Sequence, residues 1–262
     1  MRTKIALIAI VVAVSGCVHT GIDTPGSNGE SGQGLVVQEF TIADRQLTTG
    51  QQSNVRVRLK NYHTEPVSIN QLSLYNTGFM QAGSKSCSPA QIGKYREGFA
   101  PEMECTWTVT APDDLGGFSS QSVTMQLNLD YSSAITNEQS PMKADFRTVS
   151  EIENRKEVRR KFSNGEVTVE VTYENPVPQD GGVVSFSLSP TGPGRVDSSY
   201  TMEYRPSSVF SDCPREVESV SEGKTTFSCE ISSGSTSARN LVFSTSYKYV
   251  KSPSLDVEVV RP

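Results

Sequence analysis

The chain is poor in the residues from which catalytic and metal sites are usually built. It has two histidines, His19 and His63, and contains no C-x-x-C pair, no G-x-S-x-G motif and no glycine-rich phosphate-binding loop. Few groups therefore titrate near neutral pH, which leaves little for general acid–base catalysis. His63 and Glu65 fall in an expected turn, and a plain turn is favoured over a catalytic pair. The acidic turn at residues 113–114 lacks the D-x-D-x-D-G spacing of a calcium loop. We expect no catalytic residue, no metal and no cofactor.

The chain also lacks the excess of basic residues that a nucleic-acid partner requires. Its net charge is −5. Removal of residues 1–16, which contain Arg2 and Lys4 and no acidic residue, would lower that charge by two, to −7. Binding to duplexes depends on clustered Lys and Arg that displace counterions from the phosphates. We therefore expect no nucleic-acid partner.

Long hydrophobic runs are absent except at the N-terminus. Residues 5–14 are apolar, follow the basic residues Arg2 and Lys4, and are too few to span a bilayer as a mature helix. The run ends in Val14-Ser15-Gly16-Cys17. This segment resembles the lipobox of prokaryotic lipoproteins. The resemblance implies a signal peptide at 1–16, a diacylglycerol on the Cys17 thiol, and export to the cell membrane or outer membrane with the folded domains extracytoplasmic. The alternative is ordinary secretion with Cys17 unmodified.

The cysteine count agrees with lipidation. The chain has five cysteines, and an odd number in an exported protein requires an explanation. Lipidation of Cys17 leaves four, which fall into two local pairs, Cys87 with Cys105 and Cys213 with Cys229. In an oxidising compartment these predict two disulfides, each within one expected domain. A zinc site is the less favoured alternative because no C-x-x-C spacing occurs.

Residues 17–34 predict a lipidated, flexible tether. Gly, Ser, Asn, Pro and Thr dominate this segment, and it has no apolar pattern from which a core could form. As a flexible coil, the 17 residues from 18 to 34 have a root-mean-square span of roughly 20–25 Å. The first folded domain can therefore stand clear of the lipid head groups, and His19 within the tether has no partner to orient it.

The rest of the chain alternates between apolar and polar residues with a period of two. Clear examples are residues 55–60, 123–131, 167–173 and 255–259, and long helical periodicity is missing. This pattern is typical of antiparallel sheets with one buried face, and therefore of an all-β fold. We expect two β-sandwiches in tandem, at 35–149 and 158–262, joined by a charged linker at 150–157. A weak internal repeat supports this division, because a strand ending in tyrosine and then a Ser-Pro step precede the last strand of each half.

One strand pair carries a family resemblance. Residues 55–61 alternate and end in asparagine, and two further short strands follow at 67–69 and 72–74. This arrangement resembles the immunoglobulin-like (Ig-like) modules, of the CARDB and fibronectin types, found in bacterial and archaeal surface proteins. The usual Asn-x-Gly turn is replaced here by Asn61-Tyr62-His63. The resemblance implies Ig-like sandwiches and an adhesion-related role. Trp107, two positions after Cys105, is expected to pack in the core of the first sandwich.

A charged segment lies between the two halves. Eight of the eleven residues from 151 to 161 are charged, and they end in Arg159-Arg160-Lys161. An Asn-Gly turn at 164–165 then predicts a hairpin into the next strand. The basic run could contact anionic lipid or glycan, or it could be an ordinary solvated face; the latter is the more frequent case.

The long loop that ends at Cys105 is the best candidate for a binding surface. It contains Tyr95, Arg96 and Phe99, residue types that are enriched at interface anchors. The alternative is that these side chains only cover the open end of the sandwich. We expect a membrane-anchored cell-surface lipoprotein that acts as a noncatalytic adhesion, scaffold or envelope-assembly module and binds a protein or glycan. The second possibility is a subunit of a surface filament or envelope machine assembled by β-strand pairing.

Overall fold

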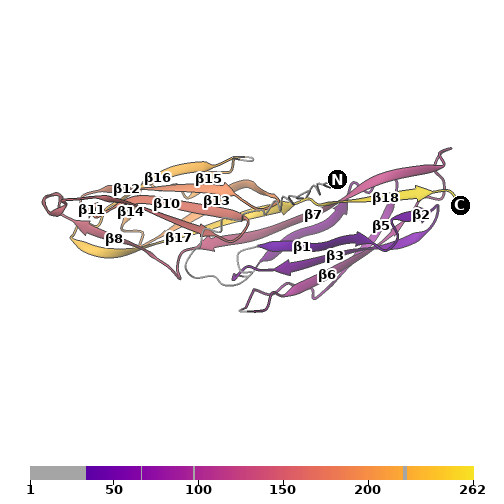
Figure 1. Ribbon diagram of the computed structural model, residues 1–262, viewed down its shortest axis with the longest axis horizontal. Coiled ribbons are helices and arrows are strands. Elements are labelled where there is room, and N and C mark those ends of the chain that lie inside the picture. The colour runs from indigo at the N-terminus through magenta and orange to yellow at the C-terminus, as the bar shows by residue number, and fades with distance from the viewer. Residues whose placement is uncertain (1–33, 66, 97, 221–222) are drawn as a thin grey trace, which may run out of the picture.

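Figure 1 shows the computed structural model, an elongated molecule in which two β-sandwiches lie end to end. The structure describes residues 34–262 except 66, 97 and 221–222. The expected signal peptide, Cys17 and the rest of the tether lie outside the described residues. Within them the chain forms strands β1 to β18 and one short 3-10 turn, η1 (Val149–Glu151), so the all-β prediction is confirmed. No helix among these residues is long and apolar enough to cross a membrane.

The first sandwich consists of two four-stranded layers. Its first sheet has the order β1-β3-β6-β5, formed by β1 (Leu35–Ile42), β3 (Gln52–Asn61), β6 (Glu102–Thr110) and β5 (Gln81–Ser88). Its second sheet has the order β4-β7-β18-β2, formed by β4 (Ser68–Tyr75), β7 (Ser120–Thr136), β18 (Ser254–Val260) and β2 (Gln46–Thr48). Neighbouring strands are antiparallel except β18 and β2. Alternate side chains of β3, β6 and β7 are buried, as the period of two predicts.

The second sandwich is built in the same way. Its first sheet has the order β14-β16-β12-β10-β9, formed by β14 (Phe210–Ser211), β16 (Thr225–Ile231), β12 (Gly182–Pro190), β10 (Val167–Asn175) and β9 (Lys156–Ser163). The opposing strands are β11 (Val177–Pro178), β8 (Met142–Arg147), β17 (Ser237–Lys251), β13 (Arg195–Arg205) and β15 (Glu216–Glu218). Only β11 and β8 pair in parallel here.

Both sandwiches have the strand order of a constant-type immunoglobulin domain, with A-B-E-D facing C-F-G. In the first sandwich, β1-β3-β6-β5 faces β4-β7-β18. In the second, β10-β12-β16-β14 faces β13-β17-β8, and β9 is an additional edge strand. The expectation of two antiparallel Ig-like sandwiches is therefore confirmed, although the final strand of each comes from an unexpected part of the chain.

The two halves exchange their last strands, which corrects the expected division of the chain. β8 precedes residue 149 but pairs with β17 and β11 of the second sandwich. β18 ends the chain but pairs with β7 and β2 of the first sandwich. The expected linker at 150–157 contains η1 and the start of β9, so it lies within the second sandwich and does not join the two.

The length of two strands explains this exchange. β7 has 17 residues and β17 has 15, and their ends extend beyond their own sandwiches to pair with each other, Tyr131 opposite Tyr249. Each strand thereby carries the one that follows it into the other sandwich. The Ser252-Pro253 step only interrupts the pairing with β7, since the N–H of Leu127 on β7 still donates to the carbonyl of Pro253 at 3.0 Å. The described part of the chain therefore passes between the sandwiches only along β7 and β17 (Figure 1).

Candidate functional site

The three predicted binding residues lie at a tight turn in the first sandwich. Arg96 and Phe99 exchange two backbone hydrogen bonds, of 3.0 and 2.7 Å. Gly98 closes the turn with φ +75°, a conformation that glycine adopts without strain, and its N–H donates to the Tyr95 hydroxyl at 3.3 Å. Phe99 is 64 % exposed, although it is large and apolar. We call residues 95–99 the Phe99 turn.

The base of this loop is held in place at several points. The disulfide Cys87–Cys105 joins directly opposed residues of β5 and β6. The Asn61 side-chain amide donates to the Gly93 carbonyl at 2.7 Å, and the N–H of Tyr95 donates to the His63 carbonyl at 2.7 Å. These contacts fix the loop before any partner binds, which lowers the entropy lost on binding. Trp107 is 4 % exposed and packs in the core, as expected.

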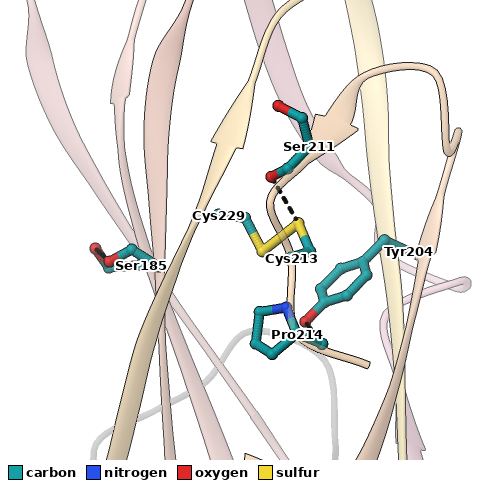
Figure 2. The surroundings of a disulfide bond; sticks show 7 residues. Ser185, Tyr204, Ser211, Cys213, Pro214 and Cys229 are labelled. Carbon is teal, nitrogen blue, oxygen red and sulfur yellow. Dashed lines mark hydrogen bonds between the residues drawn. A yellow bond between two sulfur atoms is a disulfide. The ribbon is translucent and has the colours of Figure 1, made fainter. Parts of the chain in front are cut away.

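The corresponding loop of the second sandwich exposes Val220, at 55 %, and no aromatic side chain among its described residues. Its disulfide is Cys213–Cys229, so both bridges are the local pairs favoured from the sequence. Figure 2 shows Tyr204 beside this bridge, with its hydroxyl donating to the Pro214 carbonyl at 2.9 Å. The Tyr204 ring also packs on Phe210 at 5.2 Å. Tyr204 and Phe210 are therefore only partly exposed and pack against each other beside the disulfide.

Each disulfide borders a surface cleft. In the first sandwich a cleft of about 510 Å³ lies between the edge strands β4 and β5, and Leu72, Lys85 and Met103 are among its lining residues. In the second, a cleft of about 600 Å³ lies between β13 and the loop that leads to Cys213. Both clefts are open grooves between the two sheets of a sandwich.

A buried polar cluster occupies the junction between the sandwiches. Its centre is Glu166, fully buried in the turn between β9 and β10. One carboxylate oxygen, Oε1, accepts hydrogen bonds from the Leu35 N–H at 2.8 Å and from the Tyr131 hydroxyl, and lies 3.2 Å from His63 Nε2. The Lys251 ammonium lies 3.6 Å from the same oxygen and donates to the Leu35 carbonyl. We call these five residues the Glu166 cluster.

The Glu166 cluster joins the β9–β10 turn, which carries Glu166, to four other parts of the chain. Leu35 begins β1, His63 follows β3, Tyr131 lies on β7, and Lys251 ends β17. The Lys251 ammonium also lies over the rings of Tyr131 and Tyr249, at 5.7 and 5.6 Å from their centroids. Strand β1, the first strand of the described chain, is thus fixed by side chains of the second sandwich.

Burial and charge shift the titrations in this cluster. Burial alone raises the pKa of Glu166, but the hydrogen bond and charge of His63, with Lys251 and Tyr131, outweigh it, so the pKa lies below its usual value. Burial lowers the pKa of Lys251, and Glu166 opposes that change. Burial and the nearby Glu166 charge raise the pKa of Tyr131. Glu166 is therefore held as a carboxylate and Tyr131 as a neutral phenol that donates to it.

Ser133, His63 and Glu166 superficially resemble a catalytic triad. Ser133 Oγ lies 3.4 Å from both ring nitrogens of His63, and His63 lies 3.2 Å from Glu166. However, Ser133 is 6 % exposed and His63 is 3 % exposed. A nucleophile must reach its substrate, and these buried side chains line neither of the two clefts. The geometry therefore supports a structural network.

Sequence reasoning missed Glu166 and Lys251 and gave His63 a different partner. His63 contacts Glu166, 103 positions later, whereas Glu65 is exposed. A signal for Lys251 was present, because it continues the buried alternation of Phe243, Thr245, Tyr247 and Tyr249 on β17. Among the described residues, no group of three or more His, Cys, Asp or Glu is placed to hold a metal ion.

Comparisons with known proteins were made at three levels. No family model matches the chain, and no curated protein matches it. Among solved structures, it is similar to the crystal structure of collagen adhesin from S. aureus, with a TM-score of 0.19 and 11 % sequence identity, over 88 % of this chain and 94 % of that one. At this TM-score the two folds do not superpose as a whole.

Proposed function

We propose that this protein is a lipid-anchored surface protein that binds a protein or glycan partner without catalysing a reaction. The observation that carries this proposal is the Phe99 turn. A phenylalanine that is 64 % exposed lies at the end of a hydrogen-bonded turn, next to the exposed Arg96 and above a loop fixed by a disulfide. Exposed aromatic and arginine side chains on a preorganised loop are typical of interface anchors.

Two further features support the proposed location. The lipobox-like segment ending in Cys17 favours a lipid anchor. The two disulfides favour an oxidising compartment outside the cytoplasm. The binding role accords with the fold, because loops at the end of a rigid sandwich commonly carry recognition.

The test begins with capture of partners from membranes by the purified chain. Replacement of Tyr95, Arg96 and Phe99 by alanine should weaken binding to the captured partner at least fivefold, which corresponds to about 1 kcal/mol for a single interface anchor. Phe118→Ala is the matched control, because Phe118 is 60 % exposed but lies between β6 and β7, outside the loop enclosed by Cys87 and Cys105. Unchanged affinity of the folded triple variant would exclude the Phe99 turn as the binding site. Turnover of a substrate would exclude the noncatalytic role.

The anchor is tested separately. Cys17→Ser should move the protein from the detergent phase to the aqueous phase in a partition experiment, because the serine cannot receive the lipid. If the variant still partitions wholly with detergent, Cys17 does not carry the anchor.

A second candidate function is assembly by β-strand pairing. The observation that favours it is β5, an exposed edge strand with one charged residue, Lys85. An exposed edge with few charges can pair with a strand of another chain. This function predicts polymers that dissociate on dilution, whereas simple adhesion predicts monomers. Sedimentation over a hundredfold concentration range distinguishes the two.

A further inference from the structure

Strand β9 carries the densest positive charge in the chain. Residues 155–161 contain five basic side chains and one acidic side chain, in a protein whose net charge is −5. Among the described strands, β9 is the outermost of its sheet and pairs only with β10, and most of its residues are exposed. Arg159, Arg160 and Lys161 are all exposed. Exposed basic side chains therefore lie on both faces of this edge strand, and we call Arg155, Lys156, Arg159, Arg160 and Lys161 the β9 patch.

Neighbouring acids neutralise only part of this patch. Arg155 pairs with Glu174 at 3.2 Å, and Arg159 pairs with Glu157 at 2.8 Å and Glu170 at 3.5 Å. Within the described chain, no carboxylate forms an ion pair with Lys156, Arg160 or Lys161. Charged side chains on an edge strand also prevent it from pairing with strands of other chains. That role does not require all the charges to be positive, and it does not require five basic residues.

The position of the patch indicates its partner. β9 ends at Ser163, and the turn that follows places Glu166 against Leu35, where the tether joins the fold. At about 3.3 Å per residue, Arg160 lies roughly 10 Å along the strand from Ser163. As the flexible tether that the sequence predicts, the 17 residues from 18 to 34 would have a root-mean-square span of roughly 20–25 Å. A lipid on Cys17 would therefore keep the β9 patch within reach of the bilayer surface.

We propose that the β9 patch docks on anionic lipid head groups of the membrane that holds the anchor. This inference rests on the lipid anchor of the proposed function. Each basic side chain near an anionic surface increases partition roughly fivefold at moderate salt. Docking orients the molecule, because one long edge of the second sandwich then faces the bilayer. It also supplies a second attachment, and stable membrane binding generally needs two.

The test uses residues 18–262, which contain every strand and lack Cys17, so the result does not depend on lipidation. Binding to vesicles is measured by co-sedimentation, with phosphatidylcholine alone or with about 30 % phosphatidylglycerol. We expect binding only to the anionic vesicles, and loss of binding in 0.5 M salt, where screening is strong. The triple variant Arg159→Gln/Arg160→Gln/Lys161→Gln should bind about a hundredfold less, and Arg159→Lys/Arg160→Lys should bind normally because charge alone is required.

The control has the same net charge as the triple variant. Arg195→Gln/Lys224→Gln/Lys248→Gln removes three exposed basic residues of the second sandwich outside β9, and it should retain binding. Equal loss in both triple variants, equal binding to neutral vesicles, or tighter binding to a lipid-free sulfated polysaccharide would each overturn the proposal. Partition of the Cys17→Ser variant tests the anchor independently, so failure of one proposal is distinguishable from failure of the other.

Discussion

The Glu166 cluster predicts a large and specific stability effect. Glu166→Gln keeps the size of the side chain and an oxygen that can accept from Leu35 and Tyr131, but it removes the negative charge. Lys251, whose side chain is 5 % exposed, would then be buried without its carboxylate. Removal of one partner from a buried ion pair costs about 3–5 kcal/mol because the remaining charge is uncompensated. Since the hydrogen bonds to Leu35 and Tyr131 can be kept, we expect a loss of about 3 kcal/mol in the free energy of unfolding.

Two further variants separate the ion pair from its surroundings. Lys251→Met should cost about 2 kcal/mol, because Glu166 keeps Tyr131, Leu35 and His63 as partners. The double variant should be at least 1 kcal/mol more stable than the sum of the two single effects predicts. The matched control is Glu170→Gln on β10, whose side chain is 21 % exposed and pairs with Arg159 at 3.5 Å. That change should cost less than about 1 kcal/mol.

The assay is urea unfolding with both disulfides intact, followed by Trp107 fluorescence and by circular dichroism. Trp107 is 4 % exposed in the first sandwich, whereas Glu166 lies in the second. Because β7 and β17 contribute to both sandwiches, we expect Trp107 fluorescence and circular dichroism to show the same unfolding transition. Both signals should then show the destabilisation caused by Glu166→Gln. A change of less than 0.5 kcal/mol, or strict additivity in the double variant, would refute the structural role of the cluster.

Acid should remove the stabilisation that the Glu166 carboxylate gives to the wild-type protein. The folded-state pKa of Glu166 lies below the ordinary value of 4.5, so the unfolded state binds more protons in the interval between the two. The stabilisation is therefore complete above pH 4.5 and is lost as the pH falls through the folded-state pKa. The difference in stability between wild type and Glu166→Gln should shrink over this interval. A difference that stays constant down to pH 2 would contradict the assignment of charge to Glu166.

Three other predictions concern the exchanged strands and the disulfides. Residues 35–149 expressed alone lack β18, so their unfolding, followed by Trp107 fluorescence, should not be cooperative. Fusion of residues 252–262 to this fragment should make the unfolding transition sharper. An equally sharp transition without residues 252–262 would contradict the exchange. Cleavage at a protease site placed within 150–157 should leave two fragments that co-elute on size exclusion and separate only in denaturant, because β8 remains paired with β17. Cys87→Ser/Cys105→Ser should lower the free energy of unfolding by about 3 kcal/mol, because the bridge closes a loop of 18 residues. Urea titration measures this loss, and no change would show that the bridge does not constrain the unfolded chain.

The candidate binding turn was within reach of sequence reasoning, and the polar cluster was only partly so. Tyr95, Arg96 and Phe99 stand together between two cysteines, and composition identified them. The pairing of Glu166 with His63 and Lys251 joins residues 103 and 85 positions apart, and no local pattern indicates such a contact. A buried charge is recognisable from sequence only where strict alternation places it among apolar neighbours, as it does for Lys251 on β17.

The sequence by itself determined that the chain is all β and which apolar positions of its alternating strands face the core, and it favoured the two local cysteine pairs. Period-two alternation fixes the buried face of each strand, because successive side chains point to opposite sides of a sheet. The tertiary structure alone decided which strands lie side by side. The alternation of β8 and β18 specifies which face each strand buries and does not specify which strand lies beside it. The choice was made by β7 and β17, which extend beyond their sandwiches, pair with each other, and carry the next strand across the junction where Glu166 binds Leu35.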